Sequence, residues 1–427
     1  MNSSEPSPSS AVSTTADSVV ADSESYHGIE KGSKAFINAS ISLFLAGFSS
    51  FSLIYCVQPL LPDLSASFGV TPAESSLALS VTTGCLALAI VLAGAFSQAL
   101  GRKGLMFCSM AAAAVLNCLV AISPEWHGVL FGRALEGIVL GGVPAVAMAW
   151  LAEEIAPKDL GKAMGLYVGG TAFGAMMGRV AMGLLTEFAS WRVAMGVLGL
   201  LCLISAIGFW YLLPNSRNFV RKPGLNLGFH IASWKYHLRN PRLIKLYAVG
   251  FMLISIFVTL FNYTTFRLSA APFGFNQTQV SMIFLAFAFG IVSSSMAGNL
   301  ADKFGRTKLL FAAFILMLAG ALLTLFGAIA MIVCGVALIT TGFFVGHSAA
   351  SSSVGAHAKR AKGHASSLYL LFYYLGSSIS GTVGGWFWQH GGWPSVVMFT
   401  GSYALAGLLL LYVSALRAKH AAHGQAF

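Results

Sequence analysis

Charge is what this sequence has least of, because Asp, Glu, Lys and Arg together make up only 9% of its 427 residues. More than half of the residues are apolar and the mean hydropathy is +0.76, which excludes an ordinary soluble domain. The apolar runs are continuous, without the alternation that would indicate a transmembrane β-barrel. A helix crosses a bilayer with roughly 20 apolar residues. The sequence therefore predicts an all-α membrane protein with twelve spans, at about 36–57, 75–97, 104–122, 128–150, 164–186, 191–213, 243–265, 278–301, 307–326, 328–350, 364–388 and 393–416.

Signatures of enzymes, metals and cofactors are also missing. The six cysteines form no Cys-x-x-Cys pair and fall in or beside predicted spans, as small apolar residues do. No Walker loop, His-Glu-x-x-His or Gly-x-Ser-x-Gly motif stands out. We therefore expect no enzyme activity, no metal, no cofactor and an energy source other than ATP.

The formal net charge of +11 reflects topology rather than nucleic-acid binding. Only Arg192 and Arg267 fall on one side of the predicted spans. The other side carries basic groups at 102–103, 158–162, 217–245, 303–308, 359–362 and 417–419. By the positive-inside rule both termini are cytoplasmic, and the basic face meets anionic lipid head groups of the bilayer. The expected location is the bacterial inner membrane, with many passes.

The chain divides into two halves joined by a polar segment. Residues 1–35 are rich in Ser, Thr and acidic residues and lack a signal peptide, so we expect a disordered cytoplasmic tail. The N-terminal six-helix half covers 36–213, the cytoplasmic linker 214–242, the C-terminal six-helix half 243–416, and a short cytoplasmic tail 417–427.

A loop motif occurs once in each half, at a constant offset. Gly94 is followed after six residues by Gly101 and Arg102, and Gly298 after six residues by Gly305 and Arg306. Other segments repeat at an offset near 202–205. Two related halves in parallel arrangement indicate a duplicated transporter with six plus six spans.

On these features the chain resembles the major facilitator superfamily, in its twelve-span drug:proton antiporter branch and arabinose-efflux-permease-like subgroup. The resemblance implies that the loops lock the cytoplasmic side when the transporter faces outward. The first loop departs from the family, with Gln98 and Ala99 in place of Asp and Arg. We therefore expect the lock to rest more on Asp302 and Arg306. The expected gating residues are Gly94, Gly101, Arg102, Gly298, Asp302, Gly305 and Arg306.

The fourth predicted span carries Arg133 and Glu136, which lie on one face of a helix because they are three residues apart. Ionisable residues at membrane depth are costly and usually functional. The resembled family more often has Gln at the position of Glu136. A carboxylate, unlike that amide, can release a proton. We hypothesise that Glu136 titrates during transport while Arg133 tunes it. A static ion pair that holds the fourth helix is the alternative.

The fifth predicted span contains Gly170, Gly174 and Gly178, and this spacing allows close packing of membrane helices. Arg179 follows at mid-span and is a candidate for holding an anionic substrate group or for pairing with Glu136. A structural bond to a backbone carbonyl is the alternative. In the resembled fold the central helices line the pathway, so the substrate cavity is expected at Arg179, Tyr55, Gln58, Asn262, Tyr263 and Tyr373. Interfacial anchoring or helix packing explains each aromatic residue equally well.

The sequence thus predicts a monomeric secondary transporter that exports small organic molecules in exchange for protons by alternating access. Drugs, sugars and metabolites all fit as substrates. A proton-symport uptake permease is the main alternative, and a transporter-like sensor without turnover is another.

Overall fold

The computed structural model describes residues 28–219 and 227–423, and within these ranges the chain is almost entirely helical. The first half contains α1 (Lys34–Tyr55), α2 (Leu61–Phe68), α3 (Pro72–Leu100), α4 (Arg102–Ile122), α5 (Trp126–Leu140), α6 (Pro144–Glu154), α7 (Leu160–Phe188) and α8 (Trp191–Leu212). α9 (Leu227–Leu238) connects the halves. The second half contains α10 (Pro241–Ser269), α11 (Gln277–Met282), η1 (Ile283–Ala286), α12 (Phe287–Phe304), α13 (Arg306–Leu323), α14 (Ile329–His357) and α15 (Lys362–His423).

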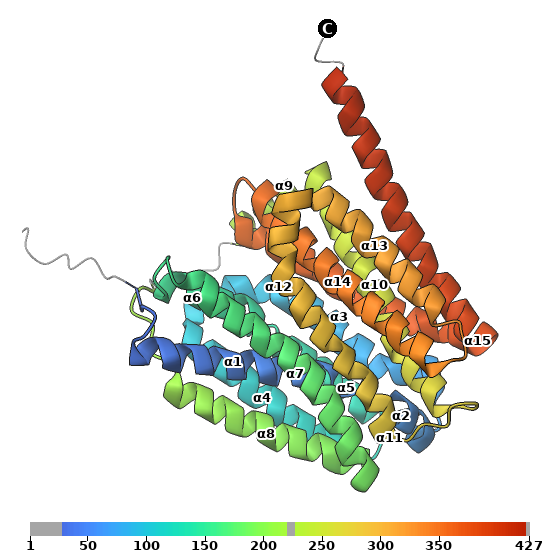
Figure 1. Cartoon of the computed structure of the whole chain (residues 1–427). Helices are drawn as coiled ribbons and strands as arrows, with labels where there is room; N and C mark the ends of the chain where they lie inside the picture. Colours follow the sequence, from blue (N-terminus) through green and yellow to red (C-terminus); the bar gives the residue numbers. More distant parts are fainter. Residues whose placement is uncertain (1–27, 220–226, 424–427) are drawn as a thin grey trace, which may run out of the picture.

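The two halves form separate bundles that converge at one end. Figure 1 shows α1 and α4–α8 in one bundle and α10 and α12–α15 in the other, with α2 and α11 side by side where the bundles meet. Hydrogen bonds between described residues near this end link the two halves. They join Gln58, Asp63 and Glu187 of the first half to Asn262, Gln277 and Thr278 of the second. The contact therefore lies at the end that the charge distribution predicts to be extracellular.

The predicted spans correspond to helices, with two departures. Ten helices of the described residues are long and apolar enough to cross a membrane, and α15 covers both the eleventh and twelfth predicted spans. Within α15 the backbone turns at Gly392, whose φ of +61° favours glycine, directly before Trp393 and Pro394. The fourth predicted span is instead divided into α5 and α6, because the chain turns at 141–143 and Pro144 starts a new helix.

The first predicted span, at about 36–57, corresponds to α1 and is followed by a turn and a short helix. α1 ends at Tyr55, and the turn at 56–60, which contains Gln58 and Pro59, precedes α2. Proline lacks an amide hydrogen and cannot continue a helix in that position. The last carbonyl groups of α1 therefore have no partner within their own helix, inside the protein.

The repeated loops have the same backbone geometry in both halves. Gly101 has φ +88° and ψ 150°, and Gly305 has φ +86° and ψ 142°. Each glycine ends one helix and precedes the next within a single residue. A positive φ of this size favours glycine, which explains why the repeat preserves Gly at both positions.

The glycines of α7 lie along its contact with α1. A Cβ atom added at Gly170, Gly174 or Gly178 would come within 2.9 Å of α1 backbone atoms. The equivalent Gly376 of α15 faces the Phe251 carbonyl of α10 in the same way. Small residues thus allow close approach at matching helix pairs in both halves.

The N-terminal segment before α1 is more ordered than the sequence predicts. Ile29 exchanges backbone hydrogen bonds with the chain after α6, donating to Glu154 and accepting from Ala156. Lys158 also forms an exposed ion pair with Glu30. Residues 28–33 therefore lie against the first half, while the rest of the predicted tail, residues 220–226 of the linker and 424–427 lie outside the described residues.

Candidate functional site

Arg133 and Glu136 form an ion pair on α5 with both side chains fully buried. Arg133 also binds three backbone carbonyls: its Nη1 donates to Leu53 at 2.9 Å, its Nη2 to Ile54 at 2.7 Å, and its Nε to Ala78 of α3 at 3.1 Å. The Leu53 and Ile54 carbonyls belong to the last turn of α1. Arg133 thus supplies hydrogen bonds to carbonyl groups that have no partner within α1 because the helix ends there.

Glu136 is bound at only one of its oxygens. Its Oε2 accepts from Arg133, while Oε1 has no hydrogen-bond partner among the described residues. Asn117 lies near the same region and donates to the Met195 carbonyl at 2.7 Å. A buried carboxylate with a free oxygen can accept a proton, because protonation removes the cost of keeping a charge out of water.

Arg179 is buried on α7 without a carboxylate partner in the described part of the chain. Its Nε donates to Gln58 Oε1 at 2.6 Å, and its Nη1 donates to the Ala175 carbonyl. The guanidinium lies 4.2 Å from the Tyr55 ring centre and 4.6 Å from that of Phe287. The predicted pairing of Arg179 with Glu136 does not occur in this structure.

Gln58 connects Arg179 to the second half. Its Oε1 accepts from Arg179, while its Nε2 donates to Asn262 Oδ1 of α10 at 2.6 Å. Asn262 Nδ2 has no hydrogen-bond partner among the described residues. Three of the predicted cavity residues therefore form one continuous polar contact from α7 through the α1–α2 turn to α10.

The other two predicted aromatic residues, Tyr263 and Tyr373, differ in their relation to this contact. Tyr263 donates to the Gly381 carbonyl at 2.7 Å and stacks near Trp388, so it packs between α10 and α15. Tyr373 of α15 forms a side-chain hydrogen bond with Tyr55, whose ring lies over Arg179. Tyr373 also lies beside His347 of α14, whose Nδ1 is 2.9 Å from the Tyr369 hydroxyl.

Sequence reasoning misses Phe284 and Phe287, whose rings both lie near Arg179. They fall in the eighth predicted span, which the sequence does not place along the pathway. Phenylalanine in an apolar span gives no signal by itself, because most such residues face lipid or other helices.

The two repeated loops have different surroundings. Arg102 is largely buried and forms an ion pair with Glu153 of α6 at 2.6 Å, within its own half. Asp302 and Arg306 of the second loop are exposed, and neither forms an ion pair in the described residues. The side chains of 94–100, including Gln98 and Ala99, lie outside the described residues. Among the described residues, Asp302 and Arg306 therefore do not form the ion pairs expected of the lock.

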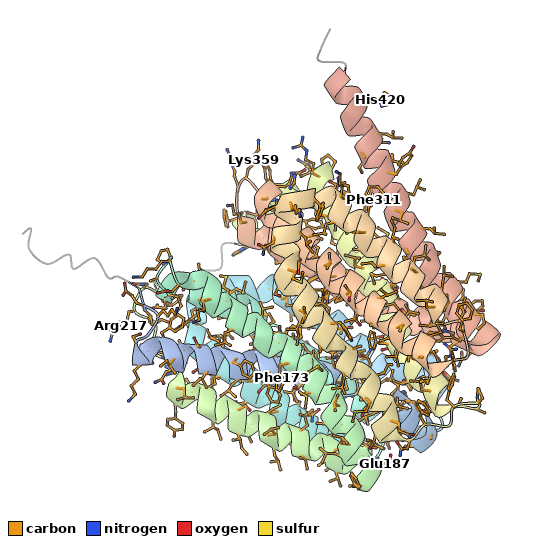
Figure 2. All side chains as sticks on the ribbon, in the orientation of Figure 1. Phe173, Glu187, Arg217, Phe311, Lys359 and His420 are labelled. Atoms are coloured by element: carbon orange, nitrogen blue, oxygen red, sulfur yellow. The ribbon has the colours of Figure 1, made fainter. Side chains whose placement is uncertain are left out.

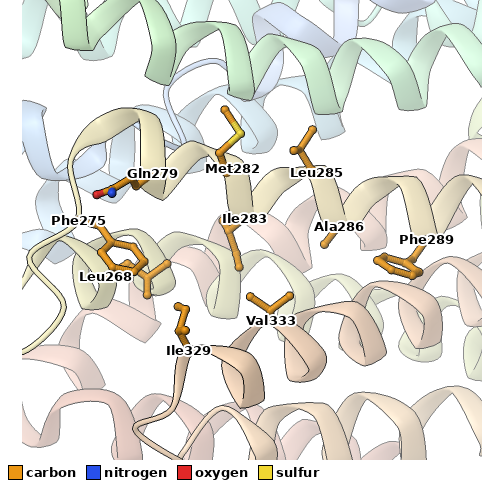
Figure 3. Close-up of a pocket in the computed structure, with 10 residues that line it drawn as sticks. All are labelled: Leu268, Phe275, Gln279, Met282, Ile283, Leu285, Ala286, Phe289, Ile329 and Val333. Atoms are coloured by element: carbon orange, nitrogen blue, oxygen red, sulfur yellow. The ribbon is translucent and has the colours of Figure 1, made fainter.

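Two apolar pockets lie away from these residues. Figure 3 shows one of about 270 Å³, between α11, η1 and α12 on one side and Ile329 and Val333 of α14 on the other. Its one polar lining side chain is Gln279. A second, of about 410 Å³, lies between α3, α4 and α5 in the first half. Neither contains a predicted site residue.

Comparison with known proteins gives the family. The sequence pattern of the Major Facilitator Superfamily matches residues 43–381 and 268–426. The chain belongs to this superfamily. It is a membrane transporter rather than an enzyme, and a multi-pass inner membrane protein. The predicted fold of the superfamily is thereby confirmed.

Similar proteins carry transporter names. The chain is 46% identical to "Inner membrane transport protein YnfM" of Escherichia coli (strain K12), over 90% of this chain and 91% of that protein. It is 44% identical to "Uncharacterized MFS-type transporter YybF" of Bacillus subtilis (strain 168), over 86% and 91%. A mutant of the nucleoside transporter NupG has a similar structure, with TM-score 0.75 and 13% identity over 88% of this chain and 99% of that one. The human organic anion transporter MFSD10 gives TM-score 0.70 and 19% identity over the same shares. The chain has the same fold as these two structures.

Proposed function

We propose that this transporter exports small organic molecules in exchange for protons, as a member of the drug:proton antiporter branch with arabinose-efflux-permease-like features. The buried Arg133–Glu136 pair carries the proposal. It places a carboxylate with one free oxygen beside the broken end of α1, where a change of charge can alter the pathway.

Protonation of Glu136 removes the charge that faces Arg133. Arg133 then keeps its bonds to the carbonyls of Leu53, Ile54 and Ala78 and its contact with Cys56 Sγ. The same α1 end leads within a few residues to Gln58, which contacts both Arg179 and Asn262. The proton site and the contact between the halves are thus joined through one short backbone segment, so each can influence the other.

Alternating access requires that the contact between the halves opens at one end and forms at the other. The present conformation is closed where α2 meets α11, which is the predicted periplasmic end. We propose that opening this end brings the cytoplasmic loops together, with Asp302 and Arg306 forming the lock beside the Arg102 loop. Gly94, Gly101, Gly298 and Gly305 shape these loops.

Proton release from energised everted membrane vesicles tests the proposal. Sugars, dyes and antibiotics are added on the cytoplasmic face while a pH-sensitive dye reports the acidity of the lumen. Export in exchange for protons makes the lumen less acidic when a substrate is added. Glu136→Gln removes the titrating group, so this response disappears. Glu125→Gln, which changes an exposed glutamate at the start of α5, keeps it.

A substrate response that survives in Glu136→Gln contradicts the assigned proton site. Substrate movement with protons in the same direction assigns the protein to uptake. Specific binding without any transport in intact vesicles assigns it to sensing.

A further inference from the structure

We infer that the substrate is an organic anion, a carboxylate with an apolar body, which binds at Arg179. This inference rests on the proposed transport function, because it names the class of molecule carried. The site consists of Arg179, Gln58 and the rings of Tyr55, Phe284 and Phe287.

The guanidinium of Arg179 has a charge that the described residues do not neutralise. The side chain is 1% exposed, and the ion pairs in the described part of the chain all involve other residues. A buried charge is costly unless it is paired. By contrast, the equally buried Arg133 has its own carboxylate in Glu136.

Arg179 also keeps hydrogen-bonding capacity for a ligand. Its Nε and Nη1 are bound to Gln58 and to the Ala175 carbonyl, but Nη2 has no hydrogen-bond partner among the described residues. The adjacent Nε and Nη2 form the planar pair of donors that matches the two oxygens of a carboxylate. A bound carboxylate takes Nη2 and displaces the Gln58 carbonyl oxygen from Nε.

The surrounding side chains define the rest of the ligand. Three aromatic rings lie within 5.3 Å of the guanidinium, measured to their centres. Tyr55 comes from α1, whereas Phe284 and Phe287 come from η1 and α12 of the other half. An apolar body beside the carboxylate contacts these rings, so the ligand touches both halves. The single unneutralised cation favours a single negative charge.

Displacement of Gln58 links binding to movement of the halves. Gln58 also donates to Asn262 of α10, so a ligand that takes its place at Arg179 alters a hydrogen bond between the halves. An anion therefore both neutralises Arg179 and weakens the closed end of the molecule, as a transported substrate must.

Equilibrium binding to the full-length protein in detergent tests the inference without any proton gradient. The probes are benzoate, phenylacetate and hexanoate, each compared with its own neutral amide by isothermal titration calorimetry. At least one carboxylate is expected to bind about tenfold or more tightly than its amide, since hydrogen bonds to a charged group are stronger than neutral ones.

Two variants and a control test whether the preference for carboxylates over amides arises at Arg179. Arg179→Gln removes the cation and the preference with it. Gln58→Glu supplies Arg179 with a permanent carboxylate at the position of the ligand, and Asn262 can turn its free Nδ2 toward the new oxygen, so the fold is retained while anion binding is lost. Lys308→Gln removes an exposed positive charge outside the site and leaves the preference unchanged.

The inference is overturned if no carboxylate binds, if the amides bind equally well, or if the preference survives in folded Gln58→Glu. Failure of the proposed transport is seen separately, because it leaves carboxylate binding intact while vesicles show no proton movement.

Discussion

At the scale of single residues, Arg133 has a structural task besides its pairing with Glu136. Its three hydrogen bonds to carbonyls of α1 and α3 need the planar fork of a guanidinium, which a lysine ammonium does not reproduce. Arg133→Lys keeps the charge but leaves buried carbonyls unsatisfied, at about 1–3 kcal/mol for each group. We expect a free energy of unfolding lower by about 2 kcal/mol or more. Thermal unfolding of the purified protein measures this.

Arg217→Lys is the matched control, because the Arg217 side chain is exposed and the same exchange there should change little. An Arg133→Lys protein as stable as the wild type would show that the carbonyl bonds are dispensable.

The sequence reveals the Arg133–Glu136 pair but not its surroundings. Three-residue spacing on an apolar helix places the two side chains together, so the pair follows from local geometry alone. The carbonyls of Leu53 and Ile54 depend on where α1 ends, and backbone groups give no signal in the sequence. Glu153, the partner of Arg102, escapes sequence reasoning for a similar reason, because the pairing depends on how α6 packs against the loop.

At the scale of helices, the contact between α7 and α1 depends on the absence of side chains. A Cβ atom at Gly174 would lie 2.3 Å from the Phe48 carbonyl oxygen. Gly174→Ala must therefore push the two helices apart, and overpacking of this kind costs about 1–3 kcal/mol. We expect a lower unfolding temperature, measured by differential scanning fluorimetry.

Gly165→Ala on the same helix is the control. A Cβ atom there meets nothing within 4 Å, and alanine has the higher helix propensity by up to about 1 kcal/mol. This variant should be as stable as the wild type or slightly more stable. Equal effects of the two substitutions would contradict the packing argument.

The helices themselves are largely predictable from the sequence, and their interruptions are not. Hydropathy defines the length of an apolar segment, so most spans agree with helices within a few residues. The turn at 141–143 within the fourth span is as apolar as its surroundings, and only Gly141, Gly142 and Pro144 mark it. The first predicted span ends at about residue 57, close to the end of α1 at Tyr55, but hydropathy gives no sign of the short α2 that follows the turn at 56–60.

At the scale of the whole molecule, acidic residues add hydrogen bonds between the halves at the closed end, beside the packing of α3 against α15. Glu187 accepts hydrogen bonds from the amides of Gln277 at 3.0 Å and Thr278 at 3.5 Å, at the start of α11, and Asp63 of α2 accepts from the Gln277 side chain. Figure 2 shows Glu187 at this end, opposite Arg217 and Lys359. These contacts must break before the protein opens toward the other side of the membrane.

Asp63 makes this contact dependent on pH. Burial raises the pKa of Asp63 to about 6, helped by the nearby Glu187 carboxylate and opposed by the Gln277 hydrogen bond. When the halves separate, Asp63 returns to water and its pKa falls toward the ordinary value of about 3.9. The closed contact then binds the proton more tightly than the open one. Acidification from pH 7 to pH 5 therefore favours the conformation described here, and a rise in pH through about 6 weakens it.

Spin labels at Ala66 in α2 and Ala270 after α10, on a background without the native cysteines, can measure this change as a distribution of distances. The short-distance population should increase as the pH falls from 7 to 5. Asp63→Asn mimics the protonated side chain, so its distribution should stay closed and independent of pH. Glu125→Gln, a carboxylate outside the contact, should respond like the wild type. A pH response that persists in Asp63→Asn, or one of opposite sign, would assign the titration of this contact to another group.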